Sequence, residues 1–186
     1  MKNHIAILII LILSFSCGKK DKPKETILIK NGSSKIAKNI KDTIIDKRKL
    51  IKFQPKVSFN DFLVKNIDNC NNAKLDFNSN KYASQFITRL RDAYKSDSSN
   101  FAGHYSFVFW GCGSSCQSSL IIDRLTGKIY DSPVASLGYE FYSKSRMLIV
   151  NPPDSNGFYE NCDYCEPMIY VLNEKTKIFE KYKEKN

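Results

Sequence analysis

Histidine is nearly absent from this chain: only His4 and His104 occur among its 186 residues. His4 lies in an N-terminal segment that has the pattern of an export signal, so we expect His104 to be the only histidine of the mature protein. A serine or cysteine nucleophile needs a base beside it. The shortage of histidine therefore leaves a single histidine to serve any such site.

Long hydrophobic runs are also absent. The longest apolar stretch, Ile5 to Leu13, is shorter than the about 20 residues that cross a bilayer as a helix. A charged start, this stretch and small residues before Cys17 are typical of a lipoprotein signal. We expect cleavage before Cys17, acylation of that cysteine with a fatty acid such as palmitate, and, with Gly18 following, sorting to the outer membrane. A signal peptide without lipidation and an uncleaved anchor are the alternatives.

Excess positive charge is missing from the larger part of the chain. Residues 17–56 hold 13 basic and 4 acidic side chains, whereas residues 57–186 hold 15 of each, although the whole chain has a net charge of +10. A neutral folded part argues against nucleic acid as a partner. We expect residues 1–16 to be a signal peptide, 17–56 a flexible basic tether and 57–186 a single globular domain.

The most distinctive stretch lies near the middle of the chain. Residues 105–110 are aromatic and β-branched, 111–116 are turn-forming, and 117–123 resume the composition of a strand. The pattern predicts an antiparallel hairpin in which Trp110 faces Gln117.

In that register His104 faces Asp123 at the open end of the hairpin. His104 is then roughly 20 Å along the strand from Trp110, which is too far for a catalytic pair with the loop. We expect His104 to be structural, bonded to Asp123 or to the main chain. The loop, with Ser114 and Ser115 and with Trp110 and His104 in the same segment, is the candidate recognition surface.

Three motifs of this region also occur together elsewhere. They are Asn100-Phe-Ala-Gly-His-Tyr105, Trp110-Gly-Cys-Gly-Ser-Ser-Cys-Gln117 and the Asp-x-x-Thr-Gly-Lys pattern of residues 123–128. Through these three motifs, the chain resembles an uncharacterised family of bacterial envelope proteins and lipoproteins. The resemblance covers roughly residues 70–135 and brings no activity with it.

Apart from Cys17, the cysteines are Cys70, Cys112, Cys116, Cys162 and Cys165. In an exported protein we expect disulfides and one free thiol, although the sequence does not fix the pairing. We predict a Cys112–Cys116 bond, because the glycines around Cys112 let the loop curl. The alternatives are a bond from Cys112 or Cys116 to Cys162, Cys165 or Cys70, or a zinc site of Cys112, Cys116, Cys162 and Cys165.

One amphipathic helix is expected at residues 81–95, with Asn80 at its start. The later segments predict a meander of six or seven short strands, in which the turn at 123–128 returns in related form at 173–177. These hairpins resemble propeller blades, but two cannot close a propeller. The predicted fold class is α+β, an antiparallel meander sheet with one packed helix.

These observations favour a membrane-anchored envelope lipoprotein that acts as a non-enzymatic binding or structural module. We expect the membrane, through the lipid, and an envelope protein as partners, and no cofactor or metal. The alternative is a secreted hydrolase or thiol enzyme that uses the Gly-Cys-Gly-Ser-Ser-Cys loop of residues 111–116.

Overall fold

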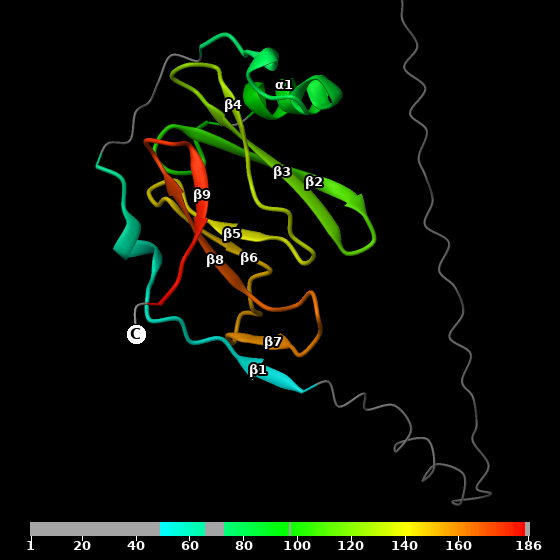
Figure 1. Cartoon of the computed structure of the whole chain (residues 1–186), viewed down its shortest axis with the longest axis vertical. Helices are drawn as coiled ribbons and strands as arrows, with labels where there is room; N and C mark the ends of the chain where they lie inside the picture. The colour runs from blue at the N-terminus through cyan, green and yellow to red at the C-terminus, as the bar shows by residue number, and fades with distance from the viewer. Residues whose placement is uncertain (1–48, 66–72, 97, 185–186) are drawn as a thin grey trace, which may run out of the picture. The chain divides into compact units, whose positions relative to one another are not determined.

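The computed structural model describes residues 49–65, 73–96 and 98–184. Within these ranges nine strands form three antiparallel sheets, accompanied by one α-helix and three short 3₁₀ turns (Figure 1). The α+β class is confirmed. The expected single sheet of six or seven strands is wrong, because the strands divide between separate sheets.

Several predicted features lie outside the described residues: the signal peptide at 1–16, the lipidation site Cys17, most of the tether, and Cys70. In the part of the chain that is described, no helix combines the length and apolar character needed to cross a bilayer.

The first sheet contains β2, β3 and β4 in chain order, and the second has the order β5-β6-β8-β9. A small third sheet pairs β1 with β7. The strands are β1 (Leu50–Lys52), β2 (Tyr105–Gly113), β3 (Cys116–Asp123), β4 (Ile129–Asp131), β5 (Tyr139–Phe141), β6 (Met147–Val150), β7 (Phe158–Glu160), β8 (Met168–Asn173) and β9 (Ile178–Lys181).

Alternating side chains of the first sheet divide between two cores. Val108, Trp110 and Ile122 face the helix α1 (Ile87–Ser96) and pack with its buried Leu90. The side chains between them point the other way, onto the second sheet. Because successive residues of a strand point to opposite faces, one strand sequence serves both cores.

The core between the two sheets is rich in aromatic residues. Phe101, Phe107 and Ile121 from the first sheet and its preceding turn meet Leu148 and Leu172 from the second. Phe107 packs against Phe141 at 4.6 Å and Phe101 stacks on Phe179 at 5.7 Å between ring centroids. The two sheets are therefore held face to face.

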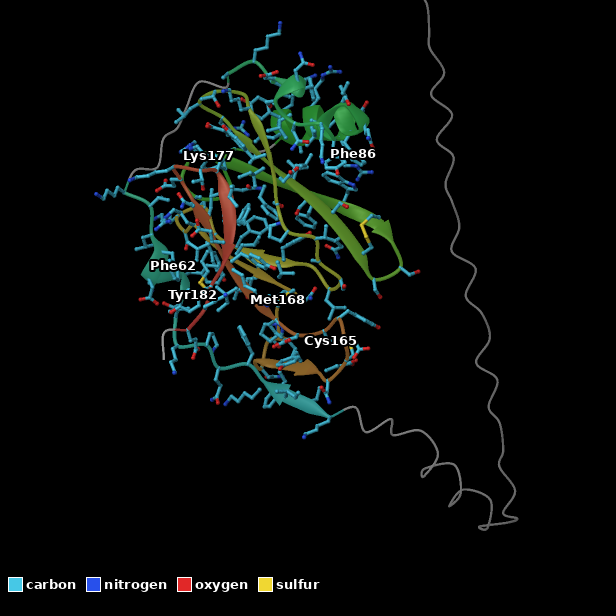
Figure 2. The ribbon with its side chains drawn as sticks, in the orientation of Figure 1. Phe62, Phe86, Cys165, Met168, Lys177 and Tyr182 are labelled. Carbon is cyan, nitrogen blue, oxygen red and sulfur yellow. A yellow bond between two sulfur atoms is a disulfide. The ribbon has the colours of Figure 1, made fainter. Side chains whose placement is uncertain are left out.

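The outer face of the second sheet is covered by the segment before residue 65. Met147, Ile149 and Ile169 pack with Phe62 of the turn η1 (Phe59–Phe62) and with Tyr182. Phe62 and Tyr182 lie next to each other in Figure 2, with ring centroids 5.8 Å apart.

The strand β1 lies on the tether side of the predicted boundary at residue 57. It pairs with β7 through Leu50–Glu160, Ile51–Tyr159 and Lys52–Phe158. The folded part of the described chain therefore includes residues before 57.

The β2–β3 hairpin forms as predicted, but in a register displaced by one residue. Trp110 lies opposite Ser118, not Gln117. The reason is a bulge between Gly111 and Gly113, where β2 holds one residue more than β3. The glycines allow it, since Gly113 has a φ of +139°.

The predicted helix at 81–95 begins later than expected. Residues 83–86 form the 3₁₀ turn η3 (Ala83–Phe86), and only Ile87–Ser96 is α-helical. Asn80 fixes the approach, because its Oδ1 accepts from the Tyr82 amide at 2.8 Å and its Nδ2 donates to Asp131 at 2.7 Å. The helix still presents Leu90 to the core.

Two connections share one turn geometry, as the sequence predicts. The side-chain oxygen of Asp123 or Asn173 accepts from the amide two residues later, at 2.9 and 3.0 Å. The main-chain oxygen accepts from the amide four residues later, at 2.8 Å in both. That last residue, Gly127 or Lys177, has a positive φ of +75° or +61°. These turns join β3 to β4 and β8 to β9.

Candidate functional site

The first motif, residues 100–105, forms a tight turn that starts β2. Ala102 and Gly103 take positive φ values of +42° and +86°. Phe101 and Tyr105 exchange main-chain hydrogen bonds at 3.1 and 3.0 Å across the turn. Gly103 N–H donates to the Ser143 carbonyl at 2.7 Å, which ties the turn to the second sheet.

His104 meets Asp123, as the sequence predicts. Its Nε2 lies 3.6 Å from Asp123 Oδ1, and both side chains are largely buried. The main chain joins the same two motifs, since the Arg124 amide donates to the His104 carbonyl at 3.1 Å. The histidine therefore links the beginning of β2 to the end of β3.

Arg124 is buried beside this pair and contacts the helix. Its guanidinium donates to Ser106 Oγ and to the Tyr94 carbonyl, the latter at 3.1 Å. The guanidinium carbon lies 4.4 Å from the centroid of the Tyr94 ring. A buried charge is tolerated when it is hydrogen-bonded in this way, so Arg124 joins α1 to the hairpin.

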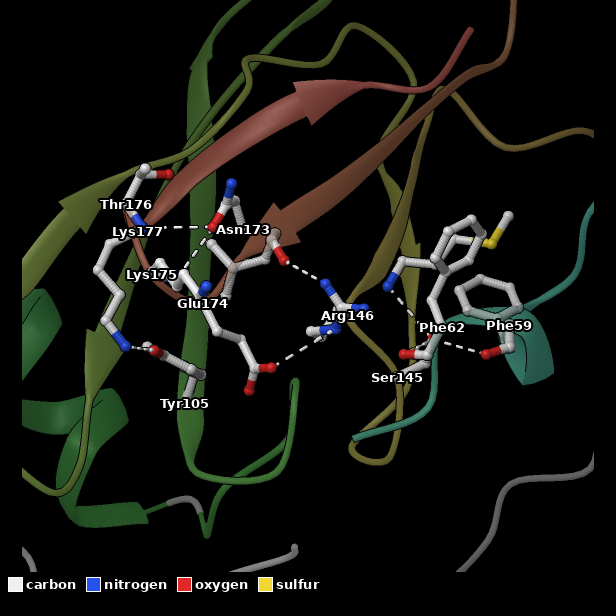
Figure 3. A network of polar contacts seen from close by, with 12 residues as sticks. Phe59, Phe62, Tyr105, Ser145, Arg146, Asn173, Glu174, Lys175, Thr176 and Lys177 are labelled. Carbon is white, nitrogen blue, oxygen red and sulfur yellow. Dashed lines mark hydrogen bonds and ion pairs between the residues drawn. The ribbon is translucent and has the colours of Figure 1, made fainter. Parts of the chain in front are cut away.

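Tyr105 and Lys177 connect the two sheets at the same end. Lys177 Nζ donates to the Tyr105 hydroxyl at 2.6 Å (Figure 3). Burial, and next the nearby carboxylate of Asp123, raise the pKa of the Tyr105 phenol above its ordinary value. Tyr105 is thus a neutral phenol at physiological pH and is not suited to act as a base.

The opposite end of β2 carries the first disulfide, Cys112–Cys116, with the Cα atoms 5.1 Å apart. The pairing predicted for the loop is the one found. Figure 2 shows a sulfur–sulfur bond at the projecting end of the hairpin. Ser114 and Ser115 are exposed within the ring, and Ser115 has a φ of +50°.

The second disulfide, Cys162–Cys165, closes the long connection between β6 and β8. It lies between β7 and β8, whereas Cys112 is within β2 and Cys116 is the first residue of β3. Both bonds span a few residues only, and β3 and β8 each lead to one of the two related turns.

Asn151 anchors the loop of the second disulfide. Its Oδ1 accepts from the amides of Ser136 and Leu137, at 2.8 and 2.9 Å. Its Nδ2 donates to the Tyr164 and Glu166 carbonyls, at 3.0 and 3.4 Å. Asn151 is buried with a φ of +54°, so one side chain fixes two loops.

The residues of the predicted recognition surface do not gather in one place. Ser114 and Ser115 are exposed at the hairpin end, whereas Trp110 is buried against Phe86, with ring centroids 4.5 Å apart. His104 lies beyond the other end of β2. Of the four predicted recognition residues, only the two serines are exposed on the loop.

The two disulfides correct the alternative predictions of a zinc site and of a reactive thiol. A zinc site of Cys112, Cys116, Cys162 and Cys165 needs four thiolates, but all four sulfurs are in disulfides. A thiol nucleophile in the 111–116 loop would likewise need a free sulfur, and both cysteines of that loop are in the disulfide. Among the described residues, no cluster of three or more potential metal ligands occurs.

A cavity of about 510 Å³ lies between β4 and the β8–β9 turn. Aromatic rings line it together with polar side chains, among them one acidic and one basic group. Its lining includes Asn80, Tyr130, Asp131, Tyr170, Lys177 and Phe179.

No known protein family, curated protein or solved structure matches the chain.

Sequence reasoning missed the residues that act across loops, above all Asn151 and Arg124. Asn151 precedes Pro152-Pro153, a signal for a chain reversal but not for its four hydrogen bonds. Arg124 lies inside a turn motif, where an exposed side chain is the ordinary expectation.

Proposed function

We propose that this protein is a lipid-anchored envelope protein whose folded part is a non-enzymatic binding module. The observation that carries the proposal is that all four described cysteines are joined in two local disulfides. Such bonds persist in oxidising compartments outside the cytosol. The lipoprotein-like segment that ends at Cys17 agrees with this location.

A binding role also agrees with the contacts that the motif residues make in this chain. His104 with Asp123, and Tyr105 with Lys177, connect strands and sheets through direct contacts. These side chains are occupied in holding the fold. A hydrolase or thiol enzyme in the 111–116 loop would need a free nucleophile, and the cysteines there are bonded to each other.

Two measurements test the proposal. Metabolic labelling with a fatty-acid analogue should mark the wild type, and Cys17→Ser should abolish the label; unchanged label in the variant would refute the anchor. Alkylation of the native protein without reductant should leave Cys112, Cys116, Cys162 and Cys165 unmodified. Rapid alkylation of Cys112 or Cys116 would instead favour the thiol enzyme.

A further inference from the structure

The outer edge of β2 is covered by the chain over only half of its length. Phe101 pairs with the main chain of Tyr105. Asn100 then acts like a piece of strand toward Phe107: its Oδ1 accepts from the Phe107 amide at 2.7 Å and its Nδ2 donates to the Phe107 carbonyl at 3.2 Å. No described residue makes an equivalent contact with the main chain farther along this edge.

Phe109 and Gly111 are the next residues whose main chain points outward. Gln117, opposite Gly111, exchanges its main-chain bonds with Ala135 on the far side of β3, at 2.7 and 2.9 Å. The Gly111–Gln117 pair is therefore a non-hydrogen-bonded pair, and Gly111 N–H and C=O face away from β3. Phe109, two residues earlier, has the same orientation.

The strand is exposed around this part of its edge. Gly111 is exposed, and an added Cβ, which would project from the face of the strand, would have no described atom within 4 Å. Figure 1 shows the hairpin projecting past β5 and β6 at this end. Phe109 is 48% exposed, although its ring rests on Tyr139 with centroids 5.6 Å apart.

The edge also lacks the usual protection. Exposed edge strands normally carry charges that prevent pairing, yet residues 105–122 contain no charged side chain. The bulge between Gly111 and Gly113 and the Cys112–Cys116 ring end the edge after two open residues. The edge is thus suited to a short strand.

We propose that the open edge of β2, at Phe109 and Gly111, binds an extended, uncharged peptide segment of a partner protein as an added strand. The segment would continue the line of hydrogen bonds begun by Asn100, and an apolar side chain would rest on Phe109. The inference deepens the proposed binding role and rests on it. A second copy of the chain fits less well, because its own Asn100 and Phe101 would meet the hairpin loop.

Amide hydrogen exchange of the full-length protein, measured with a synthetic peptide, tests the proposal. The probe is acetyl-Thr-Val-Thr-Val-Thr amide, and its control has the same side chains with alternate amides N-methylated. At saturating peptide we expect exchange at the Phe109 and Gly111 amides to slow by about tenfold or more, with no effect of the control. Unchanged exchange at both amides, or equal protection by the control, would overturn it.

A matched pair of variants separates this proposal from the broader binding role. Phe109→Lys places a charge on the edge, whereas Leu125→Lys places one on an equally exposed side chain in the β3–β4 turn. We expect only Phe109→Lys to abolish the peptide effect and to weaken crosslinking to partners in intact envelopes. If Phe109→Lys abolished peptide binding but left the crosslinking intact, the partner would bind elsewhere on the protein. That result would overturn the edge proposal and leave the broader binding role standing. Protection that rises with protein concentration alone would assign the edge to a second copy and overturn the proposal.

Discussion

At the scale of single residues, Gly127 shows how closely the chain packs around the shared turn. Its φ is +75°, and a Cβ there would lie 1.9 Å from the Lys74 carbonyl oxygen. The same approach lets Asp76 N–H donate to the Gly127 carbonyl at 2.9 Å. Lys177, at the matching position of the other turn, tolerates a side chain.

We therefore expect Gly127→Ala to destabilise the fold by more than about 2 kcal/mol, through backbone strain and the clash together. Gly157→Ala is the matched control, since Gly157 has a φ of +82° but open space around it. Strain alone should cost the control about 1 kcal/mol. Chemical denaturation of both variants measures the difference, and equal losses would show that the contact with Lys74 relaxes freely.

Tyr105 makes stability depend on pH at the alkaline end. Its pKa is raised in the folded state by burial and then by Asp123, so the folded protein keeps the phenol proton after the unfolded chain has lost it. This contribution is complete below about pH 10 and is lost as the pH rises above that value. Denaturation midpoints between about pH 9 and 11 should fall less steeply in Tyr105→Phe. The exposed control Tyr164→Phe should follow the wild type.

At the scale of elements, the local features were predictable and the long-range ones were not. The Cys112–Cys116 ring and the paired turns follow from a few neighbouring residues. The pairing of Leu50 with Glu160 depends on the folding of everything between them. The one-residue shift of the hairpin depends on a bulge that two glycines permit but do not require.

The loops around Asn151 offer a test at this scale. We expect Asn151→Ala to destabilise the protein by about 2–4 kcal/mol, because buried main-chain groups of two loops lose their partners. Asn151→Asp keeps the acceptor for Ser136 and Leu137 but loses the donor to Tyr164 and Glu166.

Hydrogen exchange in Asn151→Asp should therefore increase in residues 162–166 more than in residues 135–138. Asn60→Asp is a suitable control, because Asn60 is exposed and lies in the turn η1. Equal increases in both loops of the Asn151 variant would show that its two sets of hydrogen bonds act as one.

At the scale of the whole molecule, the folded unit includes residues that composition assigns to the tether. Phe53 packs with the outer core of the second sheet, and its amide donates to the Gly157 carbonyl at 2.8 Å. The basic character of residues 17–56 conceals this contribution, because Phe53 is the only aromatic residue among them.

Truncation distinguishes the two boundaries. A chain that starts at Lys49 should match the full-length protein in denaturation midpoint. A chain that starts at Val57 should be less stable by about 2 kcal/mol, since it loses β1 and the contacts of Phe53. Equal stability of the two chains would show that residues 49–56 do not contribute to the fold and belong to the tether.

The turns after β3 and β8 share one geometry, and each of these two strands contributes to a core on one side of its sheet. Ile122, one residue before the first turn, faces α1; Leu172, one before the second, faces the first sheet. The outer face of the first sheet is therefore covered by α1, and the outer face of the second by the segment around Phe62. The described chain is thus layered in the order α1, first sheet, second sheet and Phe62 segment, so that each sheet is buried on both of its faces.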